Sequence, residues 1–332
     1  MRNEYKFSGL DYKDVYIVPQ YSEIDSRSKV DLSVELTDKC TLQVPVISAN
    51  MDTVTGWRMA VAMYKAGAIG ALHRFMTIED NILQYSMVRA QNTDCFVSIG
   101  VNRDSQERAI KLYEMGARLF IIDIAHGHSK LMKDMLGWLR ATLPSVFIVA
   151  GNVATYRGTM DLAIWGADAI KVGIGPGAVC LTKNVTGVTV PQFGAIEETA
   201  DAAEDYTSLY RQPIHVIADG GIREYGDVAK AIGAGASMVM AGGLFSGTDE
   251  APGDLIDGKK VYRGMASRGA MNIIRSEEDM PTPEGTSILV SSKGPVGSIV
   301  SDIRGGLKSA FSYSNALNMA SFHSRVRFGI RK

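Results

Sequence analysis

Eight short runs of apolar, often β-branched residues recur along the chain and constrain its fold more than any other feature. Most lie about 20 to 30 residues apart, so each gap has room for one helix. A strand buried on both faces reads as a continuous apolar run, which is typical of parallel sheets. The runs are VPVISA (44–49), AIGAL (68–72), FVSIGV (96–101), LFIIDIA (119–125), VFIVAG (146–151), AIKVG (169–173), HVIADG (215–220) and MVMAGG (238–243).

Glycine-alanine pairs mark boundaries between helix and strand. Each pair follows a segment with helical spacing and precedes an apolar run, and glycine readily adopts the left-handed conformation that ends a helix. Helix and strand therefore alternate, and we predict an α/β protein with a single TIM (β/α)8 barrel domain over residues 1–332. The pairs are Gly67-Ala68, Gly116-Ala117, Gly166-Ala167 and Gly235-Ala236.

Two stretches interrupt the regular spacing. The gap after the sixth run opens with the glycine-rich GIGPGAVCLTK (173–183), and insertions after a barrel strand lie on the catalytic face. A second irregular stretch, rich in acidic residues, Pro and Gly, follows the eighth run from Thr248 to about Ser292. We predict a catalytic loop after strand six and a mobile lid after strand eight.

Charge and composition exclude several classes of partner. The formal net charge of -1 gives no general attraction to nucleic acid or an anionic membrane. The charged N-terminal segment does not resemble a signal peptide, and no apolar run approaches the length of a membrane span. Three cysteines in a chain of this size fit a reducing compartment, so we expect a cytoplasmic protein.

Glycines close the last two predicted strands, in ADGGI (218–222) and MAGG (240–243). Barrels commonly bind phosphate there through exposed backbone amides, and glycine lets the backbone approach the anion. The alternative is that these glycines only form tight turns. Asp219 stands beside them, where a carboxylate accepts hydrogen bonds from sugar hydroxyls or, alternatively, caps a helix.

Cys180 is the cysteine placed for chemistry, because it follows a glycine-rich loop whose amides stabilise a thiolate. An incidental thiol is the alternative. Cys40 and Cys95 precede or begin apolar runs and are interpreted as buried or incidental thiols. His126 and His128 form an H-x-H pair without a third ligand at a useful spacing, which is a weak metal signal.

Taken together, these motifs resemble the inosine monophosphate dehydrogenase and GMP reductase superfamily in order and over nearly the whole chain. GIGPG followed three residues later by a cysteine, with ADGGI about forty residues beyond, is more specific than any glycine motif alone. The resemblance implies a barrel enzyme that acts at C2 of a purine ring through a covalent thioimidate on the cysteine. The matching segments are ISANMDTVT, DIAHGHS, VAGNVAT, KVGIGPGAVC, VPQ, ADGGI, GDVAKAIGAGA, VMAGG and YRGMAS.

Within the superfamily, several features favour a GMP reductase over an IMP dehydrogenase. HRFMTIED leads to CFVSIGV without the regulatory module that dehydrogenases usually carry there. The segment between Met271 and Glu284 is short and lacks the Arg-Tyr pair with which dehydrogenases activate water. The segments SRS (26–28), ANMDT (49–53), HRF (73–75) and LKSAFSY (307–313) also look like reductase forms.

Other residues are less typical of a reductase. VYRGMASRGAM and the Pro-Glu-Gly at 283–285 look equally like a dehydrogenase. Ala178 and Ala266 stand where reductases often have serine, and Pro281 replaces an arginine of many reductases. A dehydrogenase without the regulatory module, or a catalytically silent purine nucleotide-binding protein, therefore remains an alternative.

The resemblance also implies roles for individual residues. In a reductase, Cys180 attacks GMP, while Thr182 and Glu284 deliver the proton that ammonia needs to leave. The ribose hydroxyls are assigned to Asp219, the phosphate to the amides of Gly220, Gly221, Gly242 and Gly243, and the base to Gly264, Met265, Ala266 and Gly285.

NADPH is the implied cofactor, and potassium a further implied ligand. Arg74 matches a position that binds the extra phosphate of NADPH. The cofactor site, partly built across a subunit boundary in an expected homotetramer, comprises Ser26, Arg27, Arg74, Asp123, Ile124, Ala125, Asn152, Ser309, Ala310, Phe311 and Ser312. Backbone carbonyls of Gly175, Gly177 and Cys180 are the implied potassium ligands.

Overall fold

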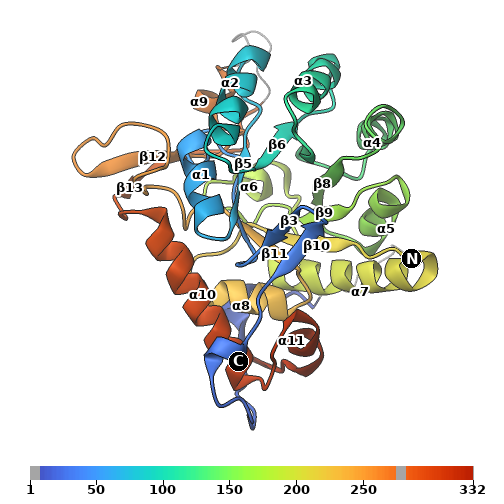
Figure 1. Cartoon of the computed structure of the whole chain (residues 1–332), viewed down its shortest axis with the longest axis vertical. Helices are drawn as coiled ribbons and strands as arrows, with labels where there is room; N and C mark the ends of the chain where they lie inside the picture. The colour runs from blue at the N-terminus through green and yellow to red at the C-terminus, as the bar shows by residue number, and fades with distance from the viewer. Residues whose placement is uncertain (1–7, 274–281, 332) are drawn as a thin grey trace.

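The computed structural model describes residues 8–273 and 282–331, and its centre is a closed barrel of eight parallel strands (Figure 1). The strands follow the order β10-β11-β4-β5-β6-β7-β8-β9. Each predicted apolar run forms one of them, so the TIM (β/α)8 barrel is confirmed. They are β4 (Val46–Ser48), β5 (Ile69–Leu72), β6 (Phe96–Ile99), β7 (Leu119–Asp123), β8 (Phe147–Val153), β9 (Ala169–Val172), β10 (His215–Asp219) and β11 (Met238–Ala241).

Helices surround the barrel (Figure 1). The predicted helix stops are confirmed, because Gly67, Gly116, Gly166 and Gly235 have φ values of 84°, 100°, 108° and 110° and each begins the turn into a strand. The helices that follow the strands are α1 (Trp57–Lys65), α2 (Ile78–Arg89), α3 (Arg103–Glu114), α4 (Lys130–Thr142), α5 (Tyr156–Ile164), α7 (Gln192–Tyr210), α8 (Tyr225–Gly233) and α10 (Val296–Tyr313).

Additional short elements lie outside this repeat. The antiparallel pairs β2-β3, β12-β13 and β1-β14 each form a separate two-stranded sheet, and β12-β13 belongs to the predicted lid stretch. None of the helices within the described ranges has the length and apolar character needed to cross a membrane. The elements are η1 (Tyr12–Asp14), β1 (Val15–Ile17), η2 (Arg27–Lys29), β2 (Val34–Thr37), β3 (Cys40–Leu42), α6 (Thr182–Thr186), β12 (Lys259–Arg263), α9 (Arg268–Met271), β13 (Ser287–Ser291), α11 (Met319–Arg325) and β14 (Phe328–Ile330).

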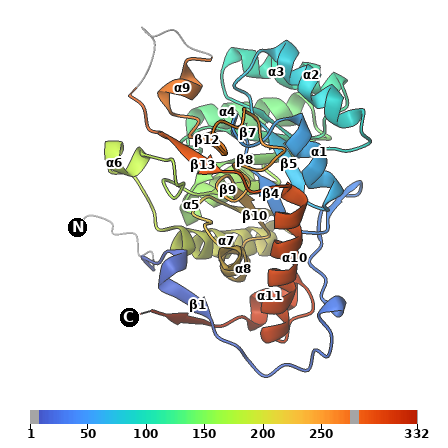
Figure 2. The ribbon, with the colours of Figure 1, turned by 90° about the vertical axis from the view of Figure 1, so that its left-hand side faces the viewer.

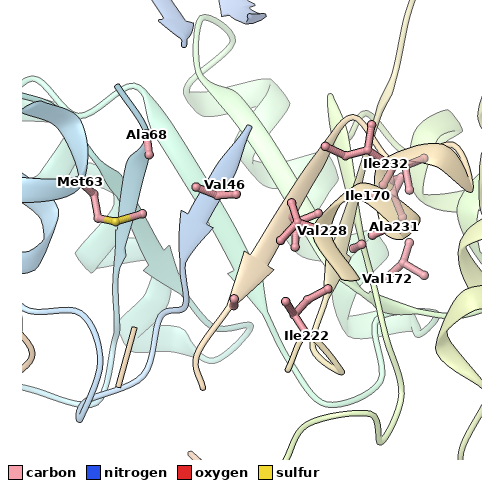
Figure 3. Close-up of a cluster of buried hydrophobic side chains, with 14 of the residues drawn as sticks. Val46, Met63, Ala68, Ile170, Val172, Ile222, Val228, Ala231 and Ile232 are labelled. Atoms are coloured by element: carbon pink, nitrogen blue, oxygen red, sulfur yellow. The ribbon is translucent and has the colours of Figure 1, made fainter. Parts of the chain in front are cut away.

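Two apolar layers follow from the pleat of the strands. In β7, Leu119 and Ile121 belong to the cluster inside the barrel, whereas Phe120 and Ile122 belong to the cluster between strands and helices. The β2-β3 hairpin adds its apolar residues to the inner cluster. Figure 3 shows part of the outer cluster, where β4 and β9 contribute side chains together with α1 and α8. The inner layer fills the barrel and leaves the carboxyl ends of the strands for polar side chains.

The inner layer predicts a large difference between two isoleucines. Ile121 is fully buried, so Ile121→Ala should lower the free energy of unfolding by about 2–5 kcal/mol through lost packing and a cavity. Ile164 on α5 is 51% exposed, and Ile164→Ala should cost less than about 0.5 kcal/mol. Urea unfolding followed by circular dichroism measures both. Equal losses would contradict the packed interior.

Candidate active site

The loop after β9 is held by backbone hydrogen bonds to the segment around Glu284. The Leu181 amide donates to the Glu284 carbonyl at 2.6 Å, and the Thr286 amide donates to the Val179 carbonyl at 3.0 Å. Cys180 forms an antiparallel bridge with Gly285 between these bonds. Two segments about a hundred residues apart are therefore fixed side by side.

A third segment, after β12, joins this pair. The Gly264 amide donates to the Thr286 carbonyl at 3.0 Å, and the Glu284 amide donates to the Ala266 carbonyl at 3.1 Å. A Cβ on Gly285 would lie 2.8 Å from the Ser267 nitrogen, so the approach of the two backbones requires glycine. The expected loop and lid residues thus meet in one place.

Cys180 and Thr182 are in direct contact within this arrangement. The Cys180 thiol donates to the Thr182 hydroxyl, with 3.2 Å between Sγ and Oγ1. Thr182 is the first residue of α6, and both side chains are partly exposed. A thiol beside a hydroxyl, with a glutamate held nearby by its backbone, provides a nucleophile and a path for protons.

Asp219, the expected ribose ligand, lies at the end of β10 within a charged cluster. The ammonium of Lys171 donates to Asp219 Oδ2 at 2.7 Å and lies 2.9 Å from Asp123 Oδ1. The Asn152 amide also donates to Asp219 Oδ2 at 2.9 Å. Burial by itself would lower the pKa of Lys171, but the two carboxylates outweigh it, so the net pKa is raised and the ammonium stays charged.

Sequence reasoning missed Lys171. The residue stands in AIKVG, whose other residues are apolar or glycine, and its side chain is only 3% exposed. A charged residue inside an otherwise apolar strand is uncommon unless it is paired, and that was the available signal. The pairing itself joins β7, β8, β9 and β10, so only the closed barrel reveals it.

The predicted phosphate-binding glycines lie at the carboxyl ends of β10 and β11. Gly220 and Gly221 have φ values of 92° and 78°, which favour glycine. Gly243 is among the residues lining a surface pocket of about 590 Å³, which also contains Arg223 and Lys293. This position and the glycine backbone are suited to an anion.

Met265 and Ala266, expected near the base, follow β12, which an ion pair fixes to the barrel. Arg263 pairs with Asp52 in the loop after β4, with 2.8 Å between Arg263 Nε and Asp52 Oδ2. The Asp52 amide is also 3.3 Å from the Met265 sulfur. The position of the predicted base-binding segment therefore depends on the loop after β4.

The expected cofactor residues form two groups, and the first lies at the mouth of the barrel. Asp123 ends β7, followed by Ile124 and Ala125. Arg74 has its guanidinium 4.9 Å from the Phe75 ring centroid, and among the described residues its buried Nε has no hydrogen-bond partner. An arginine with an unpaired donor at the mouth of the barrel is suited to an anionic group of a ligand.

The second group lies against the C-terminal end of α10. Arg27 donates to the Tyr313 hydroxyl at 3.2 Å, and Ser26 caps η2. Figure 2 shows α6 on one side of the barrel and α10 on the other, so the structure does not bring this group to Cys180 within one chain. Ser309 and Ala310 are partly exposed, Ser312 is nearly buried, and the buried Phe311 ring stacks on Phe322.

The candidate cation ligands Gly175, Gly177 and Cys180 lie together in the loop after β9. Gly175 has a φ of 86°, and the Cys180 amide donates to the Gly177 carbonyl at 3.1 Å. Carbonyl oxygens of such a loop suit potassium. By contrast, His128 pairs with Asp161 at 2.9 Å, and in the described part of the chain no cluster of three His, Cys, Asp or Glu side chains is placed to hold a metal.

The other two cysteines lie outside the loop after β9. Cys95 is fully buried, as predicted, and burial raises its pKa well above the ordinary value. Cys40 is partly buried, and burial raises its pKa to about 11. Both thiols therefore remain protonated near neutral pH.

The fold is a TIM barrel, and a cysteine and a threonine are in contact after its sixth strand. This combination is typical of an enzyme active site. The family model for the IMP dehydrogenase / GMP reductase domain matches residues 9–331. The chain belongs to this family of oxidoreductases.

Relatives named for either of the two activities are similar to the chain. A GMP reductase from Phytophthora infestans is 39% identical over 334 residues, covering 96% of this chain and 90% of the relative. An inosine-5'-monophosphate dehydrogenase from Cryptosporidium parvum is 36% identical over 360 residues, covering 92% and 88%. The solved structure of a cysteine-to-alanine GMP reductase variant from Trypanosoma brucei, in complex with guanosine 5'-monophosphate, has a TM-score of 0.89 at 30% identity, covering 98% and 95%.

The contact between the three segments predicts a sharp sensitivity at Gly285. In Gly285→Ala the new methyl group would press on the backbone of Ser267, separate the segments and displace Glu284. We expect turnover to fall at least about tenfold, the cost of misplacing a catalytic group. The control is Gly137→Ala in α4, where an added Cβ meets nothing within 4 Å and activity should be unchanged. Steady-state kinetics of the parent and both variants measure these changes in turnover.

A buried histidine predicts acid sensitivity. His73 is 8% exposed, and burial lowers its pKa from 6.5 to about 4, although the Asp52 carboxylate acts in the opposite direction. The unfolded chain therefore binds a proton that the folded protein excludes, and stability is lost as pH falls from about 6.5 towards 4. His73→Gln should reduce the loss between pH 7 and 5 by about 1–2 kcal/mol, measured by urea unfolding. An identical pH dependence in parent and variant would contradict this assignment.

Proposed function

We propose that the protein is a GMP reductase, which converts GMP, NADPH and a proton into IMP, NADP⁺ and ammonia. The observation that carries the proposal is the contact between Cys180 and Thr182, held by backbone hydrogen bonds against the segment of Glu284. This arrangement supports nucleophilic attack and proton transfer at the same carbon of a substrate.

In this mechanism the Cys180 thiolate attacks C2 of GMP. The adduct takes up a proton on a ring nitrogen, and Thr182 and Glu284 relay a second proton to the departing amino group. Loss of ammonia then forms a cationic thioimidate on Cys180. The chemistry that NADPH supplies when bound is a hydride for C2. Release of the Cys180 thiolate and loss of one ring proton then give IMP.

Substrate binding follows from the ends of the barrel strands. Asp219 accepts hydrogen bonds from the ribose, and the amides of Gly220, Gly221, Gly242 and Gly243 bind the phosphate. The segment from Gly264 to Ala266 and Gly285 contact the base. Their location at the carboxyl ends of β10 and β11 and beside Cys180 supports these roles.

For the cofactor, we assign Arg74, Asp123, Ile124, Ala125 and Asn152 to NADPH at the mouth of the barrel. The residues Ser26, Arg27 and 309–312 would complete this site from a second copy of the chain, consistent with a homotetramer. Their separation from Cys180 within one chain supports that proposal. Potassium at Gly175, Gly177 and Cys180 and a cytoplasmic location belong to the same proposal.

The choice between the two family activities rests on sequence. The segment between Met271 and Glu284 has no Arg-Tyr pair with which to activate water, which favours the reductase. Residues 274–281 of this segment, with Pro281, lie outside the described residues. An IMP dehydrogenase that consists of the barrel alone is the second candidate, favoured by the 36% identity to the Cryptosporidium parvum enzyme.

The decisive measurement is absorbance at 340 nm with GMP plus NADPH and, separately, with IMP plus NAD⁺. A reductase consumes NADPH and releases ammonia, and it does not form XMP at a comparable rate. Cys180→Ala should reduce turnover at least about a thousandfold yet still bind GMP, because the thiol supplies covalent chemistry and not the phosphate or ribose contacts. Cys40→Ala is the matched control and should keep its activity.

Three results would contradict parts of this proposal. Rapid XMP formation without NADPH consumption would assign the protein to the dehydrogenases. Tight binding of GMP or IMP without turnover in either direction would indicate a silent nucleotide-binding protein. Activity of Cys180→Ala within about tenfold of the parent would remove Cys180 as the nucleophile.

A further inference from the structure

We propose that Lys171 is a positioning residue shared by the two ligand sites, which holds the Asp219 carboxylate for the nucleotide and the Asp123 carboxylate for the cofactor. The inference rests on the proposed function, because that function assigns Asp219 to the ribose and Asp123 to the nicotinamide cofactor. Neither the glycine motifs nor the cysteine loop accounts for a lysine at this place.

The location of Lys171 makes it part of the barrel interior. In β9, Ala169 belongs to the inner cluster and Ile170 and Val172 belong to the outer one, so the pleat directs Lys171 inward. Its side chain is 3% exposed. A Cβ on the neighbouring Gly151 would lie 2.6 Å from the Lys171 Cβ, so glycine at that position makes room for the lysine.

Three acceptors surround the ammonium, one from each of three strands. Nζ lies 2.7 Å from Asp219 Oδ2 and 2.9 Å from Asp123 Oδ1, and it also donates to Asn152 Oδ1. An ammonium has three donors, so the cluster satisfies all of them. The geometry of Lys171 is therefore fully determined by its partners, and the positions of its partners depend on Lys171.

The charges of the cluster explain why both carboxylates need this cation. The buried ammonium is the cation paired with both carboxylates, and its removal would leave Asp219 without a paired cation and Asp123 with only the more general attraction of Arg74. The Asp123 and Asp219 side chains remain 22% and 19% exposed. Each carboxylate is thus held on one side by Lys171 and still accessible to a ligand.

The shared position of Lys171 predicts how variants of the cluster should bind the two ligands. Loss of Lys171 should weaken both ligands, whereas loss of either carboxylate should weaken chiefly its own ligand. Lys171→Met alone creates an uncompensated pair of carboxylates and is prone to misfold. The test therefore uses Asp123→Asn combined with Lys171→Met, which keeps the parent's net charge, and compares it with Asp123→Asn alone.

The readout is the dissociation constant of GMP and of IMP, measured by titration calorimetry. We expect the double variant to bind both nucleotides at least about tenfold more weakly than Asp123→Asn, since the Asp219 carboxylate keeps the Asn152 amide but loses its charged partner. In the reciprocal comparison, Asp219→Asn with Lys171→Met should bind NADPH at least about tenfold more weakly than Asp219→Asn alone. Lys230→Met, which removes another paired lysine on α8, is the control and should leave both constants within about twofold.

Melting temperatures separate positioning from a merely structural role. A structural lysine would lower the melting temperature and the binding-competent fraction, but the folded protein would keep its dissociation constants. Nucleotide and NADPH constants within about twofold of the single variants would overturn the inference while leaving the proposed function intact. Failure of the parent to bind either nucleotide would contradict the proposed function, and this inference with it.

Discussion

The pleat of the barrel strands is the constraint on which the rest of the structure depends. Because successive side chains point to opposite faces, each strand supplies one set of residues to the barrel interior and another to the helices. The inward set is apolar at Leu119 and Ile121 and becomes charged at Asp123, where β7 reaches the mouth. The same register that packs the core therefore also places the site.

The charged cluster and the cysteine loop are held in place by different interactions. Lys171, Asp123 and Asp219 place charges in a dry interior and depend on mutual pairing, since an isolated buried charge is costly. Cys180 is fixed by backbone contacts, because Gly264 and Gly285 allow three chain segments to approach more closely than any side chain would permit. The ion pairs fix the charge of the site, and the glycines fix the distance between the chain segments.

Membership of the IMP dehydrogenase / GMP reductase family does not by itself decide which of the two reactions the protein catalyses. In the proposed mechanism Cys180, Thr182 and Glu284 would serve either activity, and relatives with both names resemble the chain over most of its length. The two activities differ in whether water reaches the intermediate. The proposal of a reductase therefore depends on the residues between Met271 and Glu284, which include no Arg-Tyr pair.

The sequence by itself determined the elements and most of the candidate residues, because hydrophobic periodicity and glycine stops are local properties of the chain. All eight barrel strands were predicted, and Cys180 was correctly placed on the loop after the sixth. Only the tertiary structure revealed Lys171 as the partner of Asp123 and Asp219, and Arg27 as the partner of Tyr313 at the end of α10. Those contacts join residues 48 or more positions apart in the sequence. The closed barrel decides which of these residues meet, and no local sequence pattern depends on that closure.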